Sequence, residues 1–197
     1  MMRNYKEIED FVIGKLKREL PKELYYHGVH HTLDVLRSAQ MIGREENISD
    51  EEMFLLKVAV LYHDAGFVKV YRNHEEIACD MVKTELPKSG FTDEEIGIIC
   101  GMIMATKIPQ APHTQLEKII ADADLEYLGT EKFEKIGRTL FEEVKIFLDV
   151  ESERQWNIIQ MNFLRSHRYF TPFCKLNREA EKQKHLKVIE TIVGDYE

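Results

Sequence analysis

Apolar residues recur every three or four positions along most of the chain, which is the period of a helix that buries one face. In the first such segment, YKEIEDFVIGKLKREL, the apolar stripe consists of Ile8, Phe11, Val12 and Leu16. The same spacing predicts further helices over residues 29–45, 49–64, 74–86, 92–107, 114–129, 130–148, 152–166 and 176–193. No pair of alternating β-branched segments flanks a tight turn, so no sheet is predicted. The sequence therefore predicts an all-α fold.

Nothing in the sequence divides the chain into separate units. It has 197 residues, enough for one domain with a substantial core, and it contains no Pro/Gly/Ser-rich linker, low-complexity tract or repeat. Loops are predicted at residues 65–73, 87–90 and 107–114. Hydrophobic residues make up 44% of the chain and charged residues 31%, as in a globular rather than a disordered protein. We therefore expect a single domain over residues 1–197.

The net charge of −8 argues against a nucleic-acid polymer as partner, because no basic stripe is available to neutralise its phosphates. A small phosphorylated ligand remains compatible with this charge, since one local cationic pocket would be enough for it. Three widely spaced cysteines, Cys79, Cys100 and Cys174, form no CxxC pair and suit a reducing compartment. No apolar segment has the length of a signal peptide or a membrane helix. We expect a cytoplasmic protein without a membrane partner, either a monomer or a homodimer.

The stretch YYHGVHHTLDVL, residues 25–36, carries three of the eight histidines within five positions. His27 and His31 are four residues apart and would share one face of a helix. His30 is instead in register with Asp34, and this pair is expected to face solvent. For any one histidine an ordinary polar position is the better interpretation, so the cluster gains meaning only from other residues.

A second feature is the pair His63 and Asp64 at the end of the segment FLLKVAVLYHDAGF. This helix is apolar around most of its circumference, which is typical of a central, buried helix. A buried carboxylate without a partner is very costly, so Asp64 needs a cation or several hydrogen-bond donors. A divalent ion would satisfy both residues, because imidazole nitrogen and carboxylate oxygen are common metal ligands. The alternative is a helix-terminal histidine followed by a capping aspartate.

A third feature is the segment IIADADLEYLG, in which two aspartates lie two residues apart. Side chains at this spacing point in nearly opposite directions on a helix. Asp124 has the apolar neighbours Ile120 and Leu128 four residues away on either side, so it is predicted to point inward. The neighbours of Asp122 at the same spacing are charged. Asp122 is therefore predicted to be solvated or to lie behind the site.

These elements, in this order, resemble the HD-domain superfamily of metal-dependent phosphohydrolases, whose pattern is H…HD…D. In this chain the pattern falls on His31, His63, Asp64 and Asp124. The stretch YHGVHHTLDV also resembles the YHNxxHxxDV signature of class I cyclic-nucleotide phosphodiesterases, with Gly28 in place of asparagine. That resemblance implies His27 as the general acid and His31 as a metal ligand.

The chain is also similar to a group of small, stand-alone bacterial HD phosphohydrolases. The shared segments are AVLYHD, RNHEEIA, IMATK, DADLEYLG and FLRSHRYFT, and the similarity extends over residues 25–190. It implies an all-helical HD bundle with a core motif region over residues 25–128 and C-terminal helices over residues 130–193 packed on it. The combination is specific for the superfamily but not for a substrate.

The resemblance also bears on the number of metal ions. Two-metal HD enzymes have two further histidines between the HD pair and the last aspartate; His74 fits the first, and none lies near IMATK. We therefore expect one divalent ion, its identity open among Mn, Co, Ni, Fe, Zn and Mg, with His74 as an additional candidate ligand. Four protein ligands would leave positions open for catalysis. The HDxxED pair of guanosine tetraphosphate hydrolases is absent, which argues against that activity.

The activity implied by the resemblance is attack of a metal-activated water on a small phosphoester, with a nucleotide as the foremost candidate. Asp64 is the first candidate for the general base, and Glu75 is the second, although it is equally well explained as an acid at a helix N-terminus. Lys107, then Arg72 and Arg168, are the candidates for phosphate contacts, although a solvated position is the commoner role of such residues.

Two other functions stay open. The protein could be a non-catalytic module that binds a nucleotide or phosphate in a metal-dependent way. It could also be an HD oxygenase that uses a pair of irons, although the missing second histidine argues against this.

Overall fold

The computed structural model describes residues 4–196, and every regular element in this range is helical. The elements are α1 (Tyr5–Glu19), α2 (Val29–Glu45), α3 (Asp50–Tyr62), η1 (Ala65–Val68), α4 (His74–Glu85), η2 (Leu86–Ser89), α5 (Asp93–Thr106), α6 (Gln115–Asp124), η3 (Glu126–Gly129), α7 (Phe133–Phe147), α8 (Glu153–Ser166), α9 (Pro172–Asn177) and α10 (Glu179–Gly194), where η denotes a 3₁₀ helix. The described residues contain no strand, and the prediction of an all-α fold is confirmed. None of their helices is long and apolar enough to cross a membrane.

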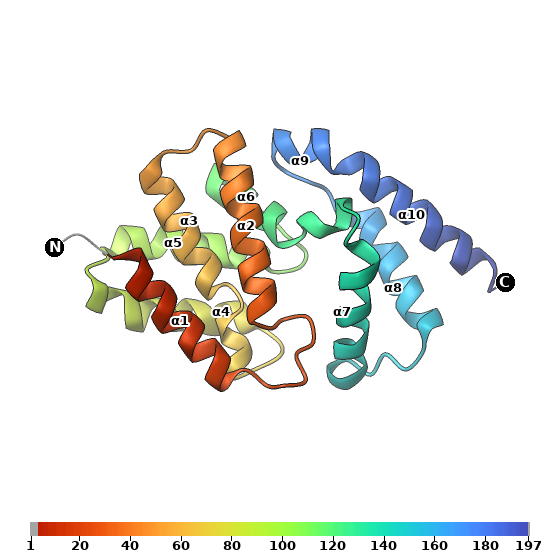
Figure 1. Cartoon of the computed structure of the whole chain (residues 1–197), viewed down its shortest axis with the longest axis horizontal. Coiled ribbons are helices and arrows are strands. Elements are labelled where there is room, and N and C mark those ends of the chain that lie inside the picture. Colours follow the sequence, from red (N-terminus) through yellow and green to blue (C-terminus); the bar gives the residue numbers. More distant parts are fainter. Residues whose placement is uncertain (1–3, 197) are drawn as a thin grey trace.

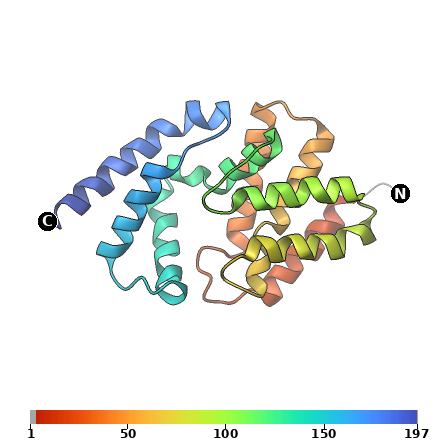
Figure 2. The ribbon, with the colours of Figure 1, turned by 180° about the vertical axis from the view of Figure 1, so that it is seen from behind.

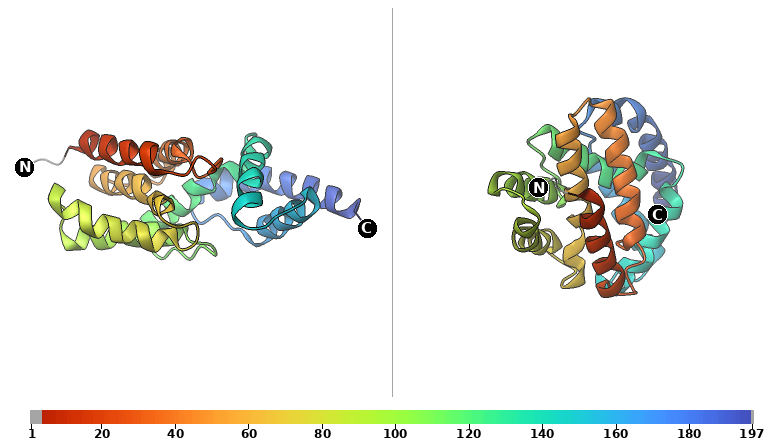
Figure 3. Two further views of the ribbon diagram at one scale, coloured as in Figure 1. Left: turned by 90° about the horizontal axis from the view of Figure 1, so that it is seen from below. Right: turned by 60° about the vertical axis from the view of Figure 1, so that its left-hand side comes forward.

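The molecule is elongated, and α1–α6 make up one half of it (Figure 1). The other half contains α7, α8 and α10, as the view from below also shows (Figure 3). Seen from behind, α5 lies beside α4, and it also packs against α6 (Figure 2). The chain passes from the first half to the second through η3, and α9 returns to contact α2 before α10 packs on α8.

Helix α3 is the centre of the first half, as its apolar sequence predicts. It contacts α1, α2, α4, α5 and α6. Its fully buried side chains are Leu56, Val58, Ala59, Val60 and Leu61. At its start, Ser49 and Glu52 form a capping box, which satisfies backbone N–H groups that the helix itself leaves unpaired. The helix ends at Tyr62, deep inside the protein and directly before His63.

The second half has smaller cores of its own. One cluster consists of Leu125, Leu128, Phe133, Leu164, Leu186 and Ile189. Another consists of Phe141, Val144, Val150 and Trp156. Both are separate from the large core around α3. Because α7 and α8 pack mainly on their own neighbours, their inner faces can border a cavity rather than close against the first half.

Several predicted boundaries and positions were wrong. The helix predicted over residues 114–129 ends at Asp124 and is followed by η3, and the helix predicted over residues 176–193 is interrupted at Arg178. The two breaks lie against each other: Gly129 packs so closely on Arg178 that a Cβ atom added at Gly129 would lie 2.3 Å from the Arg178 carbonyl oxygen. Phe11, predicted within the stripe of α1, is 52% exposed.

For Asp122, two positions were predicted: solvated or behind the site. The first was wrong, because this side chain is fully buried. Its carboxylate accepts hydrogen bonds from the backbone N–H groups of Phe170 (2.9 Å) and Thr171 (2.8 Å) and from the Thr171 hydroxyl (2.6 Å). These donors come from the segment between α8 and α9. Asp122 therefore fastens that segment to α6.

A buried His–Lys contact lies at the end of the same segment. The Lys182 ammonium is 3.3 Å from His167 Nδ1, donates a 2.8 Å hydrogen bond to the His167 carbonyl oxygen and pairs with Glu179 at 2.9 Å. Burial, together with the neighbouring charge of Lys182, lowers the pKa of His167 to about 4. His167 is therefore neutral in the folded protein at neutral and mildly acidic pH.

We expect His167 to lower the stability of the fold as the pH falls from about 6.5 to about 4. In this range the unfolded chain binds a proton at His167 and the folded chain does not, so acid favours unfolding. A pKa shift of this size corresponds to about 3 kcal/mol at most. The free energy of unfolding, measured with urea at several pH values, should therefore fall less steeply in His167→Gln than in wild type. His113→Gln, at an exposed histidine, is the control and should keep the wild-type slope; equal slopes for all three proteins would contradict the expectation.

Candidate metal centre and its cavity

Four of the predicted site residues converge in the first half of the molecule. His31 comes from α2, His63 and Asp64 follow α3, and Asp124 is the last residue of α6. His31 Nε2 lies 3.0 Å from Asp124 Oδ1 and 3.4 Å from Asp64 Oδ2. His63 Nε2 lies 3.2 Å from Asp64 Oδ2 and 3.7 Å from Asp124 Oδ1. The structure thus brings together two imidazoles and two carboxylates from three separate segments.

The arrangement fits a bound divalent cation. Ligand atoms of His31, His63 and Asp124 all lie within 4.8 Å of one another. The Nδ1–H of His63 donates a 2.8 Å hydrogen bond to the Val60 carbonyl oxygen, which turns Nε2 toward the centre. Nε2 of His63 and Oδ2 of Asp64 are both buried without a hydrogen-bond partner. Because such groups are costly to bury, a cation shared between them accounts for their position.

Both carboxylates of the centre are ionised. Burial alone would raise the pKa of Asp64, but the imidazoles of His63 and His74 hold it well below its ordinary value. Burial alone would also raise the pKa of Asp124, but hydrogen bonds and charge from His31 and His63 lower it to about 2. The centre therefore presents two anionic oxygens to a cation at neutral pH.

His74, at the start of α4, faces the other oxygen of Asp64. Its Nε2 lies 3.4 Å from Asp64 Oδ1 and 3.5 Å from Glu75 Oε1. This contact depends on Gly66 in η1, since a side chain there would lie 1.9 Å from the His74 carbonyl oxygen. Only glycine lets η1 pack so closely on α4. His74 and the buried Glu75 thus stand at the edge of the centre, beside the three mutually close ligands rather than among them.

His27 is close to the centre but is not on a helix, so the argument that it shares a helical face with His31 was wrong. It lies in the loop before α2, which begins at Val29. The loop nevertheless holds its ring near the site, with the centroids of the His27 and His31 rings 5.8 Å apart. The ring of Phe67 stacks on His27 at 4.3 Å and on His74 at 3.8 Å.

Glu143 of α7, which sequence reasoning missed, holds His27 in place. Its carboxylate, fully buried, accepts hydrogen bonds from the backbone N–H groups of Tyr26 (2.8 Å) and His27 (3.0 Å). It also bonds His27 Nδ1 and accepts a 3.1 Å hydrogen bond from the Tyr71 hydroxyl. Nothing in the segment FEEVK distinguishes Glu143 from Glu142, which is half exposed and pairs with Lys145. The partners of Glu143 lie more than seventy positions away in the sequence, so no local pattern could reveal them.

The three predicted phosphate contacts lie away from this centre. The Lys107 ammonium pairs with Glu76 and donates a 3.1 Å hydrogen bond to Asn73. Arg72 is exposed in the loop before α4. Arg168 donates hydrogen bonds to backbone carbonyl oxygens near its own position. None of the three lines the cavity described next, and a role for them in binding phosphate stays a prediction.

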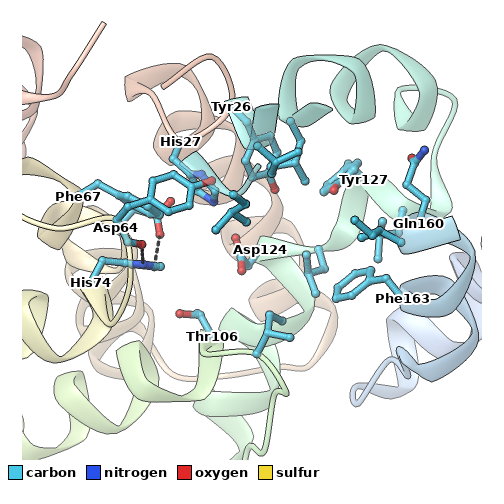
Figure 4. Close-up of a pocket in the computed structure, with 18 of the residues that line it drawn as sticks. Tyr26, His27, Asp64, Phe67, His74, Thr106, Asp124, Tyr127, Gln160 and Phe163 are labelled. Atoms are coloured by element: carbon cyan, nitrogen blue, oxygen red, sulfur yellow. Dashed lines mark hydrogen bonds and ion pairs between the residues drawn. The ribbon is translucent and has the colours of Figure 1, made fainter. Parts of the chain in front are cut away.

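A cavity of about 310 Å³ opens from the centre toward the second half of the molecule. Its polar end is lined by His27, Asp64, His74, Glu75 and Asp124. Figure 4 shows Asp64 and His74 at this end, with Gln160 and Phe163 of α8 at the other. A cavity of this size is suited to a small molecule. The side chains at its polar end therefore lie where they could act on a bound substrate.

Comparison with known proteins identifies the family. The HD domain family matches residues 28–126, half of the chain, and the chain belongs to this family. An uncharacterized protein of Clostridium beijerinckii (strain ATCC 51743 / NCIMB 8052) is 34% identical over 86 residues, which are 42% of this chain and 54% of that protein. The chain thus matches only about half the length of this relative.

A solved structure shows the same fold. The crystal structure of a predicted HD superfamily hydrolase from an uncultured Thermotogales bacterium superposes with a TM-score of 0.62 and 17% sequence identity. The superposition covers 98% of this chain and 92% of that one. The similarity therefore extends beyond the HD motif region to the helices of the second half.

We expect wild-type protein dialysed against manganese or cobalt to retain about one ion per chain, measured by mass spectrometry. Asp64→Ala removes an anionic ligand and should retain less than about a tenth of this amount. Asp122→Asn is the control, because Asp122 lies on α6 near Asp124 but bonds the segment before α9. It should bind the full amount of metal while melting at a lower temperature, since an amide cannot accept all three hydrogen bonds. Full metal content in Asp64→Ala, or two ions in wild type, would contradict the expectation.

Proposed function

We propose that the protein is a metal-dependent phosphohydrolase that cleaves a small phosphoester. The observation that supports this most strongly is the pair of buried ligand atoms without a hydrogen bond, His63 Nε2 and Asp64 Oδ2, with Asp64 lining the polar end of a cavity of about 310 Å³. A site that only stabilised the fold would not need to border such a cavity. Membership in the HD-domain family agrees with this proposal.

A divalent ion held by His31, His63, Asp64 and Asp124 would supply a lowered pKa for a bound water and a positive charge for the phosphoryl oxygens. Around it, Asp64 turns Oδ1 toward His74 and the cavity, so this oxygen is the first candidate to accept the proton of the attacking water. Glu75 also lines the cavity and is the second candidate.

His27 is proposed to donate the proton to the leaving oxygen. Its Nδ1 is bonded to Glu143, which leaves Nε2 for proton transfer at the cavity that the ring lines. Glu143 is in this view a positioning residue, which fixes the orientation of the ring through two backbone contacts and one ring contact. The same hydrogen bonds connect the loop before α2, which carries His27, to α7 in the second half of the molecule.

The substrate is proposed to be a small phosphorylated molecule, and the sequence resemblance favours a nucleotide. The experiment is a phosphate-release assay with manganese, cobalt, nickel, zinc, iron or magnesium, on aryl phosphates, alkyl phosphates and nucleoside monophosphates. We expect turnover that depends on added metal and falls at least about 100-fold in Asp64→Ala. Protein that holds one ion but cleaves none of these esters would support the binding-module alternative. Two irons per chain with oxygen-dependent turnover would support an oxygenase instead.

Glu143→Gln is expected to lower kcat by about 10-fold to 100-fold for alkyl phosphates, because an amide cannot keep all the contacts by which the carboxylate orients His27. The loss should be much smaller for p-nitrophenyl phosphate, whose leaving group needs little help from an acid. Glu142→Gln is the matched control, one residue away on the same helix and without contact to the site, and should behave as wild type. Equal losses on both classes of ester would mean that Glu143 acts only on stability.

A further inference from the structure

The wall of the cavity changes character with distance from the metal centre. Beyond its polar end, the lining consists mainly of aliphatic and aromatic side chains, among them Phe67, Phe133, Leu140, Trp156 and Phe163. Of the described residues of α7 and α8 that line it, Gln160 alone is polar, and its amide already lies 3.4 Å from Asn157 Oδ1. No lysine or arginine of the described part of the chain lines this cavity.

A second cavity, of about 370 Å³, borders the same centre at His31 and Asp124 and differs in charge. Its walls include Arg37, Lys132 and Lys135. Neither lysine has an ion pair within residues 4–196, whereas Arg37 pairs with Asp34. These three cations therefore line, together with the acids Asp34 and Glu126, the cavity that lacks the proposed acid and base.

This distribution limits the charge of the substrate. The phosphoryl group that reacts must lie between Asp64 and His27, at the polar end of the first cavity. A second phosphate or a carboxylate farther along that cavity would meet apolar side chains and no cation, and burying an unpaired charge is very costly. The first cavity therefore suits a substrate with a single phosphoryl group whose remaining part is uncharged.

We propose that the first cavity binds the apolar alcohol part of a phosphoric monoester, an alkyl chain or an aryl group, next to the metal centre. This rests on the proposed function and refines its substrate class. Phe67, stacked between the rings of His27 and His74, forms the wall nearest the ester oxygen. Side chains of α7 and α8 form the far wall, so the second half of the molecule determines which ester fits.

The single tryptophan of the chain, Trp156, lines this cavity and reports on its occupant without turnover. The experiment titrates metal-loaded protein with alkylphosphonates from methyl to octyl, whose P–C bond cannot be hydrolysed, and follows Trp156 fluorescence. Burial of each methylene is worth about 0.8 kcal/mol, so we expect the dissociation constant to fall up to about fourfold per methylene until the cavity is full. A nucleoside monophosphate and a bisphosphonate should bind more weakly than octylphosphonate.

Substitutions in the wall locate the effect. Leu140→Phe, on α7, and Leu148→Phe, directly after α7, narrow the cavity, and Leu148 is exposed enough at its edge to be replaced without harm to the fold. Both substitutions should raise the dissociation constant of octylphosphonate by about tenfold or more and that of methylphosphonate by less than about twofold. Ile146→Phe, exposed on the same helix and outside the cavity, is the matched control and should change neither. Lys132→Ala and Lys135→Ala in the second cavity should also leave both affinities unchanged.

The outcomes separate this inference from the proposed function. Tight binding of nucleotides or bisphosphonates without any dependence on chain length, or a large loss of affinity in Lys132→Ala, would overturn the inference and leave a metal-dependent phosphohydrolase standing. Chain-length-dependent binding without hydrolysis of any ester would overturn the proposed function but not the assignment of the cavity. If metal-loaded protein binds no phosphonate, both are wrong.

Discussion

The structure depends on a carboxylate that is almost completely buried. Asp64 follows the buried central helix α3, and its Oδ2 faces His63 Nε2 with neither atom hydrogen-bonded. Burial of this kind would destabilise the fold unless a positive charge compensates for it. His31 and Asp124 complete the surroundings from two other helices. The packing of α2, α3 and α6 thus brings the residues of the candidate metal centre together.

The second half of the molecule is coupled to this centre through two contacts of different kinds. Glu143 holds the loop before α2, and with it His27, by hydrogen bonds that begin on α7. The apolar faces of α7 and α8 form the wall of the cavity on the side away from the metal. One helix therefore both orients the proposed acid and shapes the space for the substrate.

Local patterns were sufficient for most of the helices and for the four residues that converge at the candidate metal centre. The helical period predicted an all-α protein, and the order of His31, His63, Asp64 and Asp124 predicted the residues that the structure brings together. Local patterns failed where the partner is distant in sequence. Asp122 has charged neighbours on its helix, yet a segment nearly fifty positions later buries it.

The remaining parts of the site could not be read from the sequence for the same physical reason. Glu143 is indistinguishable from Glu142 until α7 is placed against the loop that carries His27. Lys107 lies beside a motif that resembles a functional one, but its ammonium pairs with Glu76. The absence of cations from the cavity wall is a property of six or more segments together, and no single segment carries a signal for it.

The most direct test of the metal centre is a crystal structure of manganese-soaked protein, with anomalous diffraction data collected on both sides of the manganese absorption edge. We expect one strong anomalous peak, coordinated by His31, His63, Asp64 and Asp124, with Oδ2 of Asp64 and Nε2 of His63 among the ligand atoms. A structure with well-defined side chains at these four positions and no anomalous peak between them would contradict the account.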